Sequence, residues 1–207
     1  MKLAIFGGTG RVGRHLIEYA TREGHTVHAL ARDPAKLPAG LNGKAVPGDV
    51  TDPAAVLATL EGCDAVLSAL GGAGLANPGA AISGGMRNIV AATEQVGGRR
   101  VLAVAGSGVL DDPRGGLRSE APDFPAVFIP ITREHVGTWD ALRGSALDWT
   151  LVCCPDLLDG ELTRRFRAMA DLLPPGGSSI SVEDVADFML QEAGKGRFIR
   201  RRVGLAY

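Results

Sequence analysis

The chain has 207 residues, which suits one large domain better than two. Hydrophobic residues make up 45% of it, enough for a sizeable core, and the formal net charge of -1 gives no global positive field for nucleic acid. The apolar run at the amino terminus is too short for a secretory signal, and no run reaches the length of a membrane span. We therefore expect a cytoplasmic protein in which residues 1–207 form a single domain.

Short apolar runs alternate with helical patterns along the chain, which is typical of βαβ units. Strands buried on both faces of a parallel sheet are almost continuously apolar, and LAIF, VHALA, AVLSAL and VLAVA fit that description. We therefore predict an α/β fold with a doubly wound parallel sheet and helices on both faces. In chain order the expected elements are strand 2–6, helix 12–23, strand 26–31, strand 44–47, helix 52–60, strand 65–69, helix 80–96, strand 100–105, helix 134–142, strand 148–153, helix 182–192 and strand 197–203.

Several local features refine this pattern. Thr51 and Ser181 are expected as the N-caps of the second and the last helix, since short hydroxyl side chains accept hydrogen bonds from first-turn N–H groups. Residues 111–130 are the only long irregular stretch, rich in Pro and Gly. Cys63, Cys153 and Cys154 are an odd number with one adjacent pair, which is no disulfide framework, so we expect three reduced thiols. Cys153 and Cys154 lie in an apolar run that is typical of a strand, so we expect them to pack in the core, and redox activity is the alternative.

A glycine-rich segment joins the first expected strand to the first expected helix. Glycines let a pyrophosphate approach backbone N–H groups that a Cβ would obstruct, and the helix N-terminus adds unpaired donors and the positive end of its dipole. The GxGxxG pattern in this context predicts a Rossmann fold, and the alternative is a glycine-rich turn without a ligand. The cofactor-binding residues expected here are Gly7, Thr9, Gly10, Arg11, Val12 and Gly13, the last of which lets the helix pack closely on the strand.

The end of the second expected strand bears on the type of dinucleotide. An acidic residue at this place would bind the ribose 2′-hydroxyl of NAD, whereas this chain has Arg32. A guanidinium forms charge-assisted hydrogen bonds with a 2′-phosphate, each contributing roughly 1.5–3 kcal/mol. We therefore predict NADP(H) rather than NAD(H), and the alternative is that Arg32 is a solvated surface residue. Arg11 and Lys36 are candidate second partners of the phosphate, while Asp33 would oppose its binding.

Two further loops are expected at the same edge of the sheet. Asp49 and Val50 follow the third strand, where Asp49 is placed to accept a hydrogen bond from the adenine amino group. The alternative for Asp49 is an ordinary carboxylate at a helix start. Leu70 and Gly71 follow the fourth strand, where a glycine lets the backbone approach the ribose and pyrophosphate of the cofactor.

Several motifs together resemble a known family. GGTGRVG, ARDPAKL, GDVTD, DAVLSALGG, GGMRNIVAA and ISVEDVADFML are similar to segments of atypical short-chain dehydrogenase/reductases. Within that group the chain resembles the NAD(P)H-binding NmrA-like proteins, and the compact flavin reductase/biliverdin-IXβ reductase type matches best in length and motif order. The resemblance is good from residue 1 to about 110, looser to about 154, and present again at 180–190.

The resemblance implies where the cofactor and substrate lie. The substrate would lie mainly against residues 107–180. In the flavin reductase type a serine after the fifth strand lies near the nicotinamide; Ser107 is the candidate here, while direct alignment places Gly106 at that position. NADPH would lie across the carboxyl ends of the strands, over Thr9–Val12, Arg32, Asp49, Val50, Leu70 and Gly71.

The chain has no acid–base pair of the usual short-chain dehydrogenase kind. These enzymes use Tyr-x-x-x-Lys, in which the lysine lowers the pKa of the tyrosine. The only tyrosines are Tyr19, in the first helix, and Tyr207, the last residue, and neither fits that motif. His135 is a candidate general acid at neutral pH, or else an exposed histidine at a helix start. The histidines and cysteines lack metal-ligand spacing, so we expect no metal site.

Three functions are compatible with these residues. Flavins and quinones need mainly to be stacked against the nicotinamide, so we favour an NADPH-dependent reductase of a flavin, quinone or similar small conjugated acceptor, with no nucleic-acid or membrane partner. The first alternative is a redox sensor that binds NADP(H) and signals to a protein partner through residues 111–130. The second is an epimerase- or dehydratase-like enzyme, which needs an acid–base pair that the chain does not offer.

Overall fold

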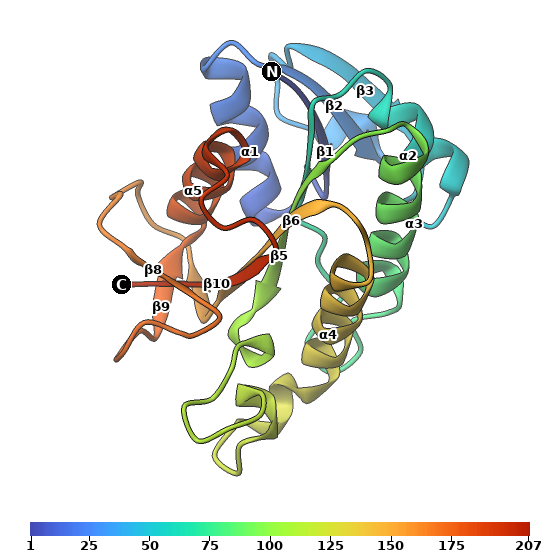
Figure 1. The fold of residues 1–207 in the computed structure, drawn as a ribbon. Coiled ribbons are helices and arrows are strands. Elements are labelled where there is room, and N and C mark those ends of the chain that lie inside the picture. Colours follow the sequence, from blue (N-terminus) through green and yellow to red (C-terminus); the bar gives the residue numbers. More distant parts are fainter.

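The structure is a computed structural model that describes residues 1–207, the whole chain, as an α/β fold centred on one eight-stranded sheet (Figure 1). The strand order is β3-β2-β1-β4-β5-β6-β10-β8, and all neighbours are parallel except β10 and β8. Two short strands, β7 and β9, form a separate parallel pair. The bounds are β1 Lys2–Phe6, β2 Thr26–Ala31, β3 Gly43–Pro47, β4 Ala65–Ser68, β5 Arg100–Gly106, β6 Asp148–Cys154, β7 Asp156–Leu158, β8 Arg167–Ala170, β9 Ser179–Ser181 and β10 Arg201–Ala206.

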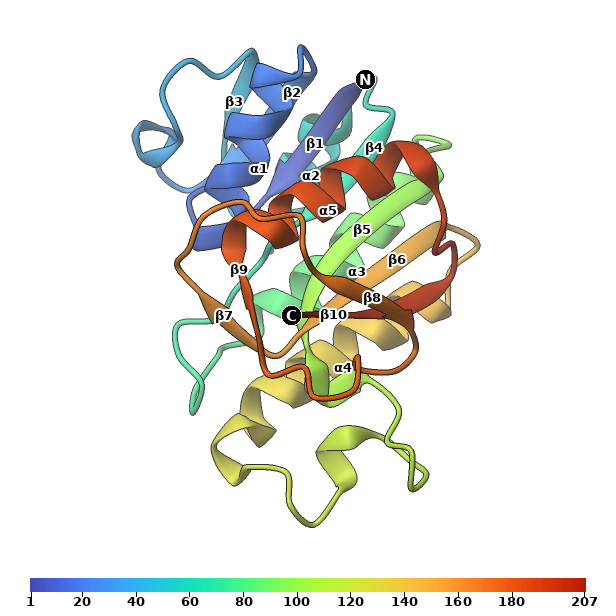
Figure 2. The same ribbon diagram turned by 90° about the vertical axis from the view of Figure 1, so that its left-hand side faces the viewer.

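Five α-helices cover the sheet in two layers (Figures 1 and 2). Helices α1 and α5 lie on one face, and α2, α3 and α4 lie on the other. The predicted doubly wound sheet with helices on both faces is thereby confirmed. The helices are α1 Arg11–Arg22, α2 Pro53–Leu60, α3 Ala81–Gln95, α4 Ile129–Arg143 and α5 Val182–Lys195.

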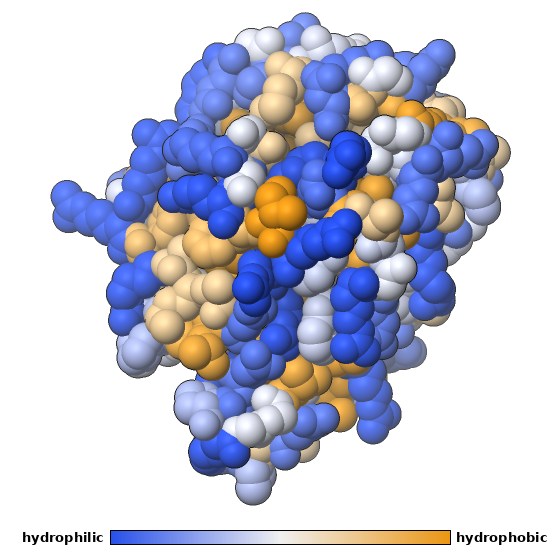
Figure 3. Space-filling model, in the orientation of Figure 1, coloured by the Kyte–Doolittle hydropathy of each residue, from blue (hydrophilic) through white to orange (hydrophobic).

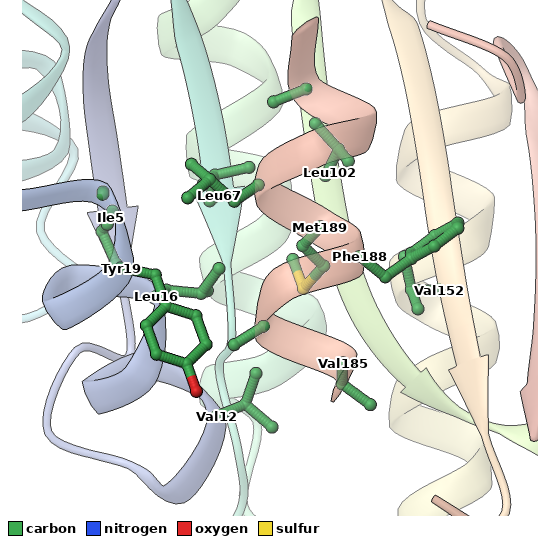
Figure 4. Close-up of a cluster of buried hydrophobic side chains, with 14 of the residues drawn as sticks. Ile5, Val12, Leu16, Tyr19, Leu67, Leu102, Val152, Val185, Phe188 and Met189 are labelled. Atoms are coloured by element: carbon green, nitrogen blue, oxygen red, sulfur yellow. The ribbon is translucent and has the colours of Figure 1, made fainter. Parts of the chain in front are cut away.

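Side chains of each central strand alternate between two hydrophobic cores. In β1, Leu3 and Ile5 face α1 and α5, whereas Ala4 and Phe6 face the opposite helices. Both faces of the strand are buried, which explains its continuous apolar run. Figure 4 shows the core between the sheet and the α1–α5 layer, where the labelled side chains are Ile5, Val12, Leu16, Tyr19, Leu67, Leu102, Val152, Val185, Phe188 and Met189.

The adjacent cysteines of β6 follow the same alternation. Cys154 packs in the core beneath α1 and α5, and Cys153 packs in the core beneath the other helices. Burial raises the pKa of Cys154 to about 12 and that of Cys153 well above its ordinary value. Both side chains are therefore protonated thiols at neutral pH and pack in the core, as the sequence predicted.

The starts of two elements lie four or five residues from those expected. Helix α4 begins at Ile129 rather than at residue 134, because Pro130 lies in its first turn, where a fixed φ and a missing N–H suit a helix start. The last strand begins at Arg201 rather than at residue 197. Helix α5 runs to Lys195 and ends at Gly196 in the left-handed conformation, and the chain turns again at Arg200, whose φ is 55°.

One of the two N-cap predictions is confirmed and the other is wrong. Ser181 is confirmed as the N-cap of α5, since its hydroxyl accepts the N–H of Asp184 at 3.0 Å. The N-cap of α2 is Asp52 rather than Thr51, and its carboxylate accepts a first-turn N–H at 2.9 Å. Thr51 instead donates both its N–H and its hydroxyl to Asp49. A carboxylate one residue closer to the helix therefore takes the capping position.

The irregular stretch expected at 111–130 projects beyond the end of β5 (Figure 2). It contains two short 3-10 helices, η3 (Arg118–Glu120) and η4 (Ala126–Phe128). The guanidinium of Arg114 crosslinks this stretch by donating to Asp112 and Asp123 at 2.7–2.9 Å. These contacts give the segment internal structure that its Pro and Gly content did not predict.

The surface drawn in Figure 3 is mainly hydrophilic, with hydrophobic residues in separate spots. None of the helices combines the length and the apolar character that crossing a membrane requires. Large exposed hydrophobic side chains include Leu75 and Leu158, which follow β4 and end β7.

Candidate dinucleotide-binding cleft

A cleft of about 820 Å³ runs along the carboxyl ends of β1 to β6. It lies at the place where the strand order reverses between β1 and β4, which is the usual ligand position in doubly wound sheets. Of the predicted cofactor-binding residues, Gly13 does not line the cleft and lies behind the glycine loop. The predicted cofactor-binding residues that do line the cleft are Gly7, Thr9, Gly10, Arg11, Val12, Arg32, Asp49, Val50, Leu70 and Gly71.

The glycine loop is packed too closely for side chains at two positions. Gly7 has a φ of 77°, and a Cβ on it would lie 2.4 Å from the carbonyl oxygen of Ala69, at the end of β4. A Cβ on Gly13 would lie 2.1 Å from the carbonyl oxygen of Gly7. The first turn of α1 therefore sits directly against the loop, as the sequence predicted for Gly13.

The N-terminus of α1 presents unpaired backbone donors to the cleft. Gly10 precedes the helix and supplies no side-chain cap, and the first turn contains no acidic residue. The first N–H groups of a helix have no intrahelical acceptor, and the positive end of the helix dipole lies there. The bare amides and the space that a Cβ would fill therefore fit a diphosphate.

Arg11 crosses the cleft instead of pointing to the adenosine end. Its Nε donates to Asp159 at 2.9 Å, and a terminal nitrogen donates to the carbonyl oxygen of Leu157 at 3.0 Å. The guanidinium thereby joins the glycine loop to the segment that follows β7. In this arrangement Arg11 does not lie beside Arg32 as a second partner for a phosphate.

Arg32 and Asp49 lie together at the ends of β2 and β3. The Arg32 side chain is 85% exposed, and its Nε lies 3.9 Å from a carboxylate oxygen of Asp49. The other oxygen of Asp49 accepts the N–H and the hydroxyl of Thr51, and the backbone hydrogen bond is the main reason for the lowered pKa of Asp49. The Nζ of Lys36, the other candidate phosphate partner, lies 3.6 Å from a carboxylate oxygen of Asp33. Arg32 is thus only weakly held and is free to contact a ligand in the cleft.

The opposite end of the cleft is formed where β5 ends. Gly106 lines the cleft, whereas Ser107 begins the short 3-10 helix η2 (Ser107–Val109) and is not part of the lining. His135 of α4 lies against this point, and its Nδ1 accepts the N–H of Gly106 at 3.0 Å. A Cβ at position 106 would lie 3.3 Å from that nitrogen, so the imidazole occupies the space a side chain would need.

His135 is neither an exposed histidine at a helix start nor a cation at neutral pH. It lies inside α4, which begins at Ile129, and faces the cleft. Burial lowers the pKa of His135 to about 4, and the nearby charge of Glu134 offsets little of this effect. The lowered pKa favours a neutral imidazole at neutral pH, and the role of His135 as a general acid stays a prediction.

Sequence reasoning missed the apolar residues that complete this end. Ile131 comes from α4, Cys154 and Pro155 from the end of β6, and Leu157 from β7. Cys154 and Pro155 could have been found from the sequence, since they stand at the end of an apolar strand. The carboxyl ends of parallel strands meet at the same edge of the sheet, where the cleft lies. Ile131 fell between the irregular stretch, expected to end at residue 130, and the expected helix from residue 134, because the start of α4 was placed too late.

Neither tyrosine reaches the cleft. The hydroxyl of Tyr19 donates to Glu183, and the hydroxyl of Tyr207 donates to Asp184 at 2.7 Å. Both acceptors are in the first turn of α5. The tyrosines therefore support the start of that helix rather than proton transfer in the cleft.

Comparison with known proteins identifies the class to which this fold and cleft belong. A profile of the NAD(P)H-binding family matches residues 7–195, and the chain is a member of that family. Its cofactor is therefore a nicotinamide dinucleotide, in agreement with the glycine loop and the bare amides of α1.

Individual relatives match all or nearly all of the chain. YwnB of Bacillus subtilis is 26% identical over 203 residues, covering 93% of this chain and 92% of YwnB. A solved Burkholderia pseudomallei structure, described as a candidate exported protein, is 34% identical with a TM-score of 0.87 and full coverage of both chains. A Streptococcus pneumoniae structure, described as a candidate NADH-flavin reductase, is 28% identical with a TM-score of 0.82, covering 100% of this chain and 99% of that one.

Proposed function

We propose that this protein is an NADPH-dependent oxidoreductase that reduces a flavin, a quinone or a similar small conjugated acceptor. The observation that carries the proposal is the composition of the cleft: a cradle for a diphosphate at one end, and at the other an apolar recess without tyrosine or carboxylate. The likeness to the Streptococcus pneumoniae structure supports it. We further propose the NmrA-like branch of the atypical short-chain dehydrogenase/reductases, on the motifs of the glycine loop and α5.

The residues of the chain have separate tasks in this proposal. The first amides of α1 bind the pyrophosphate, Arg32 binds the 2′-phosphate, and Asp49 accepts from the adenine. When bound, the reduced dinucleotide supplies a hydride. Ile131, Pro155 and Leu157 exclude water and hold a flat acceptor in place. Because conjugated acceptors delocalise the charge they gain, orientation replaces the missing acid–base pair.

The direct test measures NADPH oxidation by the purified protein with riboflavin, FMN and a series of quinones. We expect turnover with at least one of these acceptors, and faster turnover with NADPH than with NADH. Tight NADPH binding with no turnover on any acceptor would contradict the reductase proposal and would indicate the sensor instead.

Arg32→Ala is expected to weaken NADPH binding by about tenfold or more, because one or two charge-assisted hydrogen bonds to the 2′-phosphate are lost. NADH binding should change little, since NADH lacks that phosphate. Titration calorimetry with both dinucleotides measures the difference. Arg99→Ala is the matched control: Arg99 is 77% exposed and also has one surface carboxylate partner, Asp148, but it precedes β5 at the far end of the sheet. Equal loss for both dinucleotides in Arg32→Ala would contradict the assignment.

A further inference from the structure

His135 is held in one orientation by the backbone of β5. The N–H of Gly106 donates to Nδ1 at 3.0 Å. A backbone N–H is solely a donor, so Nδ1 must be the unprotonated nitrogen of the ring. The proton of the neutral imidazole is then on Nε2, which has no hydrogen-bond partner within the protein. His135 therefore offers the cleft one free N–H donor.

The surroundings of the imidazole keep it neutral. Gly106 of β5, which donates to the ring, is uncharged, and the charged neighbour is Glu134 on the same helix. The Glu134 carboxylate is engaged by α3, where it accepts the N–H and the hydroxyl of Ser83 at 3.1 and 2.7 Å. Burial holds the pKa of His135 near 4, so the ring stays uncharged across the physiological pH range.

The charged residues of the cleft come from its dinucleotide side, and the Arg11 guanidinium reaches from there to the carbonyl oxygen of Leu157 at the edge of the apolar recess. The lining residues that carry a charge at neutral pH are Arg11, Arg32 and Asp49, which come from the start of α1 and from the ends of β2 and β3. Arg11 is already paired with Asp159. The lining residues contributed by α4, by β7 and by the ends of β5 and β6, where His135 lies, are instead mainly apolar and include Val104, Ala105, Ile131, Cys154, Pro155 and Leu157.

Resting on the proposed function, we propose that the acceptor is an uncharged, flat, conjugated carbonyl compound whose oxygen accepts a hydrogen bond from Nε2–H of His135. An anionic group placed here would lose its hydration, and the Arg11 guanidinium at the edge of the recess is already paired with Asp159, so the loss is poorly compensated. A planar uncharged ring instead gains apolar contact, and its carbonyl oxygen meets the single free donor. The site thereby selects against phosphate- or carboxylate-bearing acceptors.

The same donor assists the reaction. Reduced dinucleotide is oxidised as its C–H bond breaks and the hydrogen leaves with both electrons to form a new bond to the acceptor. The acceptor becomes an anion whose charge spreads onto the carbonyl oxygen, where a fixed N–H in an apolar cleft stabilises it. Neutral His135 keeps its proton, so the anion takes one proton from water to complete the reduced product.

The substrate class is tested with riboflavin and FMN, which share one ring system and differ in a phosphate group. Binding to the NADP⁺-loaded protein is measured by quenching of flavin fluorescence. We expect riboflavin to bind about tenfold more tightly or better, because only FMN must desolvate a charge at the apolar end. Equal binding, or tighter binding of FMN, would overturn the assignment of an uncharged acceptor.

The donor is tested with His135→Asn and His135→Gln. The Asn oxygen can replace Nδ1 as acceptor for Gly106 but removes the donor, whereas the Gln amide nitrogen can approximate Nε2–H. We expect kcat for riboflavin reduction to fall on the order of a hundredfold in Asn, and Gln to recover part of that loss. The KM for NADPH should change little in either variant. An equal fall in both variants would overturn the role of Nε2–H.

A spectroscopic measurement needs neither turnover nor a variant. In 15N-histidine-labelled protein without ligands, the His135 resonances should show protonated Nε2 and unprotonated Nδ1, unchanged from pH 5.5 to 8. Protonated Nδ1 would overturn the inference even if the enzyme reduces flavins. Absence of reduction with every flavin and quinone, alongside the expected tautomer and normal NADPH binding, would instead overturn the proposed function.

Discussion

Gly7→Ala is expected to weaken dinucleotide binding by about a hundredfold or more, because displacement of the loop removes at least two charge-assisted hydrogen bonds to the pyrophosphate. The new methyl group would lie 2.4 Å from the Ala69 carbonyl oxygen, at a position whose φ of 77° already disfavours a side chain. The loop must therefore move away from the end of β4. Titration calorimetry with NADPH measures the loss, and circular dichroism checks that the sheet is retained.

Gly24→Ala separates the two contributions to that result. Gly24 has the same φ of 77°, but no atom lies within 4 Å of a Cβ placed on it. This control should lose only about 1 kcal/mol of stability from the left-handed backbone, with unchanged NADPH affinity. Wild-type affinity in Gly7→Ala would show that the close approach to β4 does not shape the cofactor site.

Acidification is expected to destabilise the protein through His135. The pKa of His135 has its ordinary value of 6.5 in the unfolded chain and is about 4 in the folded protein. The unfolded state therefore binds more protons than the folded state at pH values between about 4 and 6.5. Stability is therefore fully present above about pH 6.5 and falls as the pH drops toward 4. One pKa unit corresponds to about 1.4 kcal/mol, so the loss is at most about 3.5 kcal/mol. The expected loss is smaller because the His135 side chain is only partly buried and solvent screens its charge.

The measurement is urea unfolding of wild type and His135→Asn at several pH values between 4 and 7.5. The asparagine does not titrate, so the difference between the two free energies of unfolding should shrink by about 2–3 kcal/mol as the pH falls across this window. His28, whose pKa is also lowered by burial, is present in both proteins and cancels in the difference. Parallel pH profiles would contradict a buried, neutral His135.

The dinucleotide half of the cleft was predictable because its determinants are local in sequence. A strand, a glycine turn and a helix follow one another directly, and their geometry places bare amides at the edge of the sheet. The ends of the next strands must meet the same edge, which placed Arg32, Asp49 and Leu70 beside the loop. The identity of the fold and the position of the candidate cofactor cleft follow from these short-range patterns.

The acceptor half depends on tertiary packing that no short pattern contains. His135 was placed at a helix start because the helix was expected to begin only after Pro130, whereas this proline lies in the first turn of α4. Its burial and its bond to Gly106 arise only when α4 packs against the end of β5. The segments β7, β8 and β9 are three or four residues long and have no periodicity that predicts them. Ser107 was favoured for its chemistry, yet the chain turns into η2 and leaves Gly106 at the cleft.

The contact from Arg11 across the cleft has a consequence for how ligands enter. The Arg11 and Asp159 side chains are 52% and 84% exposed, and an ion pair of this kind contributes only about 0–1 kcal/mol. Thermal motion can therefore break it without unfolding either segment, and dissolved salt weakens it further. While the ion pair is broken, a long ligand such as a dinucleotide can enter the cleft from the side, directly onto the ends of the strands. The Arg11–Asp159 pair can form again after the ligand has bound.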